Sequence, residues 1–78
     1  MDTKFDICLD VRGEESPIPM IKVDIVCQVL DEGEVLKVMT NSEGSKRNIE
    51  NLVGSGKWEL VHRQALSNEH HFYIRKPQ

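Results

Sequence analysis

The order of strand-like and helix-like segments constrains the fold of this chain more than any other feature of its sequence. Two segments have the three- and four-residue apolar spacing of helices, and four shorter segments are apolar and β-branched, as strands are. The expected order is strand 5–10, helix 17–32, strand 35–40, helix 43–54, strand 58–65 and strand 70–75. Because strand–helix–strand crossovers are right-handed, this βαβαββ order predicts an α/β fold. We expect an α+β two-layer sandwich, with two helices on one face of a mixed four-stranded sheet.

The apolar residues of each helical segment predict which face covers the sheet. In the first helix the expected stripe is Ile18, Ile21, Ile25, Val26, Val29 and Leu30, with Gly33 placed to end the helix. In the second helix the expected buried residues are Ile49, Leu52 and Val53, and Asn41-Ser42 offers the N-cap.

The last two strands are expected to form a hairpin about the turn Ser67-Asn68-Glu69, but the sequence leaves its register open. Pairing centred on residue 67 places Trp58, Leu60 and His62 on one face with His70, Phe72 and Ile74. A shift of one residue would exchange the faces of one strand.

Composition limits the class of protein. The chain has 78 residues, 38% hydrophobic and 29% charged, which predicts one globular domain over 1–78. Its net charge of −3 gives no electrostatic footprint for direct nucleic-acid binding. No apolar run is long enough for a membrane span, and the alternating apolar and charged residues 1–10 do not form a signal peptide. A cytoplasmic location is therefore expected.

The segment 9–19, Leu-Asp-Val-Arg-Gly-Glu-Glu-Ser-Pro-Ile-Pro, connects the first strand to the first helix. Ser16 suits an N-cap because its hydroxyl can accept from a helix amide that lacks a partner. Pro17 suits the first helical position, where no amide donor is needed. Side chain 16 is therefore expected at the positive end of a helix, exposed to water, where an anion or thiolate is stabilised.

This segment resembles the signature of the TusA/SirA-like sulfur carriers, Asp-x-Arg-Gly-x-x-Cys-Pro-x-Pro. The matching residues are Asp10, Arg12, Gly13, Pro17 and Pro19, and the family cysteine falls on Ser16. Similarity continues at residues 42–45 and 72–76, so it covers about residues 7 to 76. The resemblance implies a sulfurtransferase-type carrier that relays persulfide sulfur without a cofactor. Its partners would be a cysteine desulfurase or another sulfurtransferase.

Ser16 makes the chain inactive as a carrier in this form, because an alcohol cannot bear a persulfide. Serine catalysis is disfavoured, since no base lies near it in the sequence. The serine is either a natural substitution or an introduced Cys→Ser change; the flanking Glu14 and Glu15, which would raise a thiol pKa, weakly favour the natural change. The alternative function is a non-carrying interaction or regulatory module on the same fold. A third hypothesis makes Cys8 or Cys27 a substitute thiol, although both are expected to be buried.

The remaining polar residues have plainer interpretations. Asp10 is expected to accept turn amides and to pair with Arg12, which would hold the loop. Candidate docking residues for a protein partner are Glu14, Glu15, Lys46 and Arg47. No metal site is expected, because His70 and His71 point to opposite faces of a strand and no third ligand lies at the required spacing.

Overall fold

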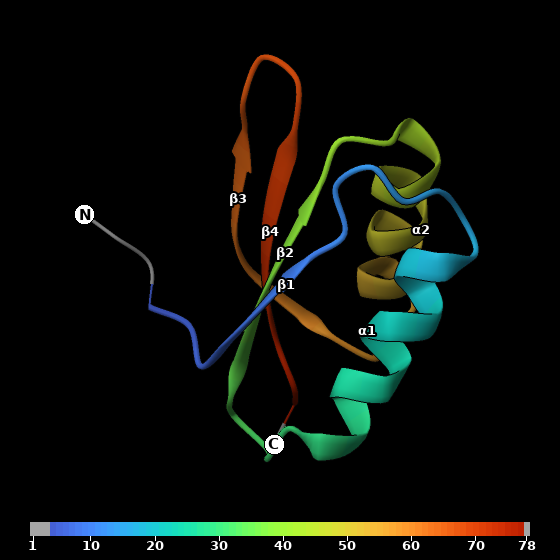
Figure 1. The fold of residues 1–78 in the computed structure, drawn as a ribbon. Coiled ribbons are helices and arrows are strands. Elements are labelled where there is room, and N and C mark those ends of the chain that lie inside the picture. The colour runs from blue at the N-terminus through green and yellow to red at the C-terminus, as the bar shows by residue number, and fades with distance from the viewer. Residues whose placement is uncertain (1–3, 78) are drawn as a thin grey trace.

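The fold is a four-stranded sheet covered on one face by two helices (Figure 1). It is seen in a computed structural model that describes residues 4–77. The elements are β1 (Ile7–Asp10), α1 (Ile18–Val29), β2 (Val35–Thr40), α2 (Glu43–Gly54), β3 (Glu59–Ala65) and β4 (His70–Arg75). The strand order is β1-β2-β4-β3; β1 and β2 are parallel, and β4 is antiparallel to both its neighbours. The predicted fold class is confirmed. The first strand begins two residues later than expected, and the first helix spans 18–29 instead of 17–32.

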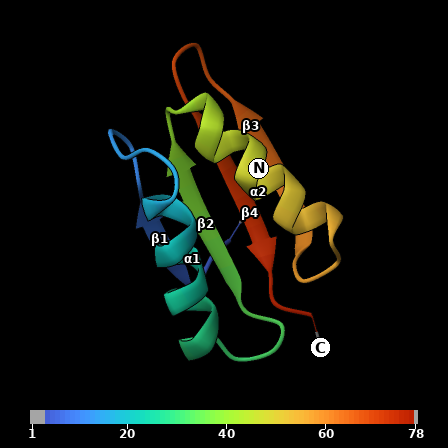
Figure 2. The same ribbon diagram turned by 90° about the vertical axis from the view of Figure 1, so that its right-hand side faces the viewer.

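The core lies between the helices and the inner face of the sheet. β2 alternates strictly, with Leu36, Val38 and Thr40 fully buried toward the helices. Ile49 of α2 and Phe72 of β4 complete the centre of this core, so α2 covers the sheet with the predicted face. Both helices lie in one layer in front of the sheet (Figure 2).

The predicted packing face of α1 is wrong. The residues of α1 and its cap that are buried are Pro19, Val23 and Leu30, with Met20, Val26 and Cys27 packed beside them. Of the expected stripe only Val26 and Leu30 face the core; Ile18, Ile21, Ile25 and Val29 are between 44% and 68% exposed. The error has a physical cause: α1 is apolar on both sides, so spacing alone could not select the inner one.

The C-terminal end of α1 is held by a lysine from the other end of the chain. The helix ends at Val29, and Gly33 adopts a left-handed conformation (φ +86°) in the following turn, not directly after the helix. The Lys76 ammonium donates to the carbonyls of Cys27 (3.2 Å) and Leu30 (2.8 Å). Carbonyls at a helix end lack partners within the helix and attract a cation.

Replacing Lys76 by methionine is expected to lower the free energy of unfolding by about 1–2 kcal/mol, because the two carbonyls lose a charged donor. Urea denaturation followed by circular dichroism measures the change. Lys57→Met is the matched control, since Lys57 is exposed. Equal stability of the Lys76→Met chain and this control would show that the cap contributes nothing.

A bulge sets the hairpin register. Ala65 pairs with His70 and Leu60 pairs with Ile74, with the irregularity between Leu60 and His62. Leu60 therefore shares a face with Ile74, as pairing about residue 67 predicts, whereas His62 pairs with Tyr73 on the opposite face. A bulge moves one part of a strand by one residue relative to the other, so neither uniform register was correct.

Candidate functional site

The loop between β1 and α1 carries the residues singled out from the sequence. Gly13 has a φ of +82°, and its amide donates to Asn41 Oδ1 at 2.8 Å. A side chain at position 13 would meet no neighbouring atom within 4 Å, so the backbone conformation alone favours glycine there. The loop is thereby tied to the start of α2, which follows the neighbouring parallel strand.

The prediction that Ser16 caps α1 is wrong. The helix begins at Ile18, the flanking position belongs to Pro17, and no side chain caps the helix. Ser16 is exposed and lies one residue too early to reach the free amides of the first turn. Of the two prolines, Pro17 is exposed and Pro19 is buried in the first turn, where neither removes a hydrogen bond that the helix needs.

Ser16 faces α2 instead. Its Oγ accepts a hydrogen bond from Asn48 Nδ2 at 2.8 Å, and a Cβ built on Gly44 would lie 4.0 Å from the Ser16 Cβ. The start of α2 is capped as expected, with Ser42 Oγ accepting from the Ser45 amide at 3.4 Å. Side chain 16 is thus an exposed group beside the amino-terminal turns of two helices, with an amide donor directed at it. Sequence reasoning missed Asn48, whose only local signal is its place one turn after Gly44.

A group of carboxylates and one arginine holds the β1–α1 loop. The Arg12 guanidinium donates to both oxygens of Asp10 (2.9 and 2.8 Å) and to Glu69 at 3.2 Å. The predicted pairing of Asp10 with Arg12 is therefore present, but Glu69, from the β3–β4 turn, was not foreseen. Glu69 in turn contacts His71 Nε2 at 3.1 Å. The loop is fastened to the hairpin as well as to α2.

Ion pairing shifts the titration of this group. Hydrogen bonds from the Arg12 side chain lower the pKa of Asp10 to about 2, from an ordinary value of 3.8. The same guanidinium lowers the pKa of Glu69, and hydrogen bonding to Asp10 raises the pKa of Arg12. Both carboxylates bind protons less readily in the folded chain than in the unfolded one, so their contribution is complete above their unfolded pKa values and is lost as pH falls toward the folded values.

Stability is therefore expected to fall between about pH 5 and pH 2, and to fall less steeply in the Arg12→Met variant. The variant should have the lower melting temperature at pH 7 and approach the unchanged chain at pH 2. Thermal melts at one-unit pH intervals test this difference. Parallel curves for the two chains would show that Arg12 does not cause the acid sensitivity.

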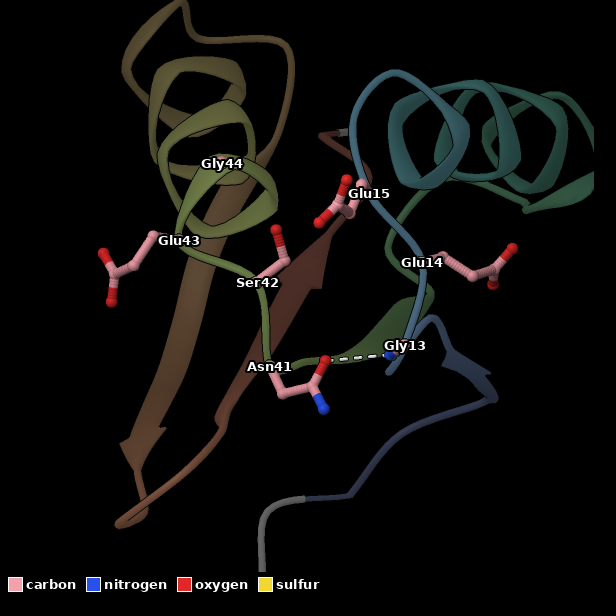
Figure 3. Close-up of a pocket in the computed structure, with 7 residues that line it drawn as sticks. All are labelled: Gly13, Glu14, Glu15, Asn41, Ser42, Glu43 and Gly44. Atoms are coloured by element: carbon pink, nitrogen blue, oxygen red, sulfur yellow. Dashed lines mark hydrogen bonds between the residues drawn. The ribbon is translucent and has the colours of Figure 1, made fainter.

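An open hollow of about 410 Å³ lies between the two loops. Its lining comes from residues 13–15 and 41–44 (Figure 3). Figure 3 shows the Glu15 carboxylate turned into the gap toward Ser42, whereas Glu14 and Glu43 turn away. Glu14 is held by Lys22, whose ammonium lies 2.7 Å from its Oε1. Of the three carboxylates in this lining, Glu15 is therefore the one that faces the hollow.

The other candidate docking residues are less free than the sequence suggests. The Lys46 ammonium is half-buried and lies 3.8 Å from Glu43 and 3.9 Å from Glu50. Arg47 is exposed on α2. Glu15 and Arg47 are therefore the more accessible members of the predicted docking set.

The expectation that both cysteines are buried is wrong for Cys8. Cys8 is exposed and pairs with Lys37 on the face of the sheet opposite the helices. Cys27 is partly buried and packs against the core from α1. Both helices cover the other face of the sheet, which explains the exposure of Cys8.

Within residues 4–77, no three His, Cys, Asp or Glu side chains are grouped so that they could hold a metal ion. Among the same residues, neither helix has the length and apolar character that crossing a membrane requires.

Comparison with known proteins gives the fold and the family of the chain. A solved SirA-like protein from Desulfitobacterium hafniense shares the fold, with a TM-score of 0.77 over 94% of this chain and all of the other, at 19% identity. A Halobacterium salinarum protein, named as a candidate sulfur carrier, is 33% identical over 79 residues, covering 97% of this chain and 98% of its own. The sulfur carrier protein TusA of Allochromatium vinosum is 26% identical over 92% of this chain and 95% of its own. The family model described as sulfurtransferase TusA matches residues 7–76, and the chain therefore belongs to the TusA family.

Proposed function

We propose that this chain is a carrier-type protein of sulfur transfer in which position 16 is the sulfur-bearing position, and that Ser16 makes it inactive as a carrier in this form. The single observation that supports this most is the place of the Ser16 side chain: exposed, at the start of α1, with Asn48 Nδ2 directed at its terminal atom. A sulfur carrier needs an accessible thiolate at such a position. The relatives named as sulfur carriers point to the same chemistry.

The reaction at a cysteine in this position is a thiol–persulfide exchange. The thiolate attacks the terminal sulfur of a donor persulfide; a new S–S bond forms, the donor S–S bond breaks, and the donor cysteine leaves as a thiolate. Electrons balance without an external oxidant. The amino end of α1 and the Asn48 amide favour the attacking anion, whereas Glu15 opposes it. A hydroxyl at position 16 remains protonated near neutral pH and forms no persulfide.

The partners implied by this proposal are proteins: a cysteine desulfurase or another sulfurtransferase. Asp10, Arg12, Gly13 and the two prolines serve as the scaffold that presents position 16. Docking then involves the charged groups around it, of which Glu15 and Arg47 are the most exposed.

The second candidate is a non-carrying interaction or regulatory module. Ser16 and the adjacent Glu15 favour this alternative, because position 16 has no thiol and a carboxylate next to it opposes a thiolate. Sulfur loading separates the two proposals. The Ser16→Cys chain should accept sulfur from a cysteine desulfurase, and the unchanged chain should not. A Ser16→Cys chain that stays unloaded would contradict the inherited carrier site and leave the interaction module.

A further inference from the structure

The helix α1 is apolar on the side that packs against the sheet and on the side that faces solvent. Its solvent side carries four large aliphatic residues, which we call the outer stripe: Ile18 (44% exposed), Ile21 (49%), Ile25 (58%) and Val29 (68%). Helices that are hydrophobic on all sides are normally covered on all sides. The described chain covers only one side of α1.

The outer stripe is continuous and begins at the candidate site. Its members are separated by three or four residues, so they lie next to one another along one side of the helix. A helix of this length extends about 18 Å. Figure 2 looks onto the helix layer, and none of the described segments crosses over α1 in that view. Because the stripe starts two residues after Ser16, a protein seated on it would reach the end of the β1–α1 loop that carries side chain 16.

The charges around the outer stripe are acidic. Residues 14–32 contain five carboxylates and a single basic residue, Lys22, which is already paired with Glu14 at 2.7 Å. The carboxylates of Glu15, Asp24 and Glu32 belong to exposed residues before, within and after α1. An apolar surface with an acidic rim is complementary to an apolar surface with a basic rim.

This charge pattern decides between possible occupants. In a symmetric dimer through the stripe, each acidic rim would face the other, and like charges brought together oppose association. An anionic lipid surface would be repelled for the same reason. A protein whose apolar groove is edged by lysine and arginine is complementary both to the apolar stripe and to its acidic rim.

We propose that the outer stripe is the docking surface for the protein that exchanges sulfur at position 16, and that this partner presents an apolar groove edged with Lys and Arg. The inference rests on the proposed function and specifies the chemistry of its partner. It assigns a role to apolar side chains that the core does not use.

The primary test measures binding of the purified chain to two probes, a cysteine desulfurase and a thiosulfate sulfurtransferase from the same organism, by isothermal titration. The Ile21→Ser/Ile25→Ser variant is expected to bind its partner about 30-fold more weakly, because apolar contacts at the centre of an interface dominate affinity. The matched control is Val61→Ser/Leu66→Ser, which removes two exposed apolar side chains (42% and 40%) from β3 and the turn after it and should change Kd less than about twofold. Thermal melts verify that both variants remain folded.

The charged rim is tested separately. Asp24→Asn/Glu32→Gln should slow association and weaken its dependence on salt, because rim charges act chiefly through long-range attraction. The control Glu59→Gln removes an exposed carboxylate from β3, outside α1 and outside the lining of the hollow. An unchanged salt dependence in the rim variant would contradict the basic edge assigned to the partner.

Four other results would overturn the docking proposal: binding to neither probe, unchanged affinity of the stripe variant, dimerisation of the unchanged chain in light scattering, or binding to lipid vesicles. Each is measured on the full chain.

Failure of this inference can be separated from failure of the proposed function by loading the Ser16→Cys chain in two ways. Inorganic polysulfide loads a thiol directly, whereas the desulfurase must first dock. The stripe substitutions should leave polysulfide loading unchanged and slow enzymatic loading. If the desulfurase loads the Ser16→Cys chain at the same rate with and without the stripe substitutions, only the docking proposal is overturned. A Ser16→Cys chain that binds the enzyme through the stripe but is loaded by neither route would overturn only the carrier function.

Discussion

A thiol at position 16 is expected to turn a chain that takes up no sulfur into one that carries a single additional sulfur atom. After incubation with a cysteine desulfurase and cysteine, intact-protein mass spectrometry of Ser16→Cys should show a gain of about 32 Da that dithiothreitol removes. The substitution replaces an exposed Oγ by a nucleophilic Sγ and keeps the Asn48 amide beside it. The unchanged chain should show no gain.

The controls for this experiment follow from the two native thiols. Cys8 is exposed and could take up sulfur by itself, so the comparison is repeated in a Cys8→Ala background. Ser16→Ala, which lacks both hydroxyl and thiol, should behave as the unchanged chain does. Peptide mapping should place the added sulfur at position 16. Sulfur found on Cys8 or Cys27 of the unchanged chain would instead support a substitute thiol and contradict the role of position 16.

Truncation of Phe72 is expected to have the largest effect on stability. Phe72 is 1% exposed, lies on the inner face of β4, and also supports the Arg63 guanidinium 5.1 Å from its ring centre. Removing a buried phenylalanine costs about 3–5 kcal/mol, which approaches the whole stability of about 5 kcal/mol at the lower end for small domains. Phe72→Ala should therefore be largely unfolded at 25 °C, as judged by circular dichroism and urea denaturation.

Two further variants serve as controls for the loss of stability in Phe72→Ala. Phe72→Leu keeps most of the buried volume and should fold with a moderate loss of stability. Leu66→Ala removes a side chain that is 40% exposed and should change stability by less than about 0.5 kcal/mol. A cooperatively folded Phe72→Ala chain with nearly unchanged stability would show that the core between α2 and β4 tolerates a cavity at its centre.

Local sequence signals predicted the elements well where one signal had no competitor. β2 and α2 have the expected bounds, because a short segment dense in β-branched and apolar residues and a serine-capped helix each allow one interpretation. The bounds of β4 were also correct. α1 differs: apolar residues on both of its sides permit two packing faces, and the expected one was largely the outer one.

The candidate site was predicted in part. The motif located the loop and the pairing of Asp10 with Arg12, since these residues are two positions apart. The partners Asn48 and Glu69 lie 32 and 57 residues away from the side chains that they contact. No local pattern connects residues at such separations. The cap assigned to Ser16 failed by one residue because helix starts depend on backbone geometry that propensity does not specify.

The sequence by itself determined the order of the elements, the loop motif and the absence of a thiol at position 16, because each depends on residue identity and on contacts within a few positions. Only the tertiary structure decided which face of α1 is buried, where the hairpin shifts at its bulge, and that side chain 16 meets Asn48. Those outcomes depend on how two layers pack and on which distant segments their packing brings together. The face of an element that becomes buried is selected by its contacts with another layer, and short-range periodicity does not specify those contacts.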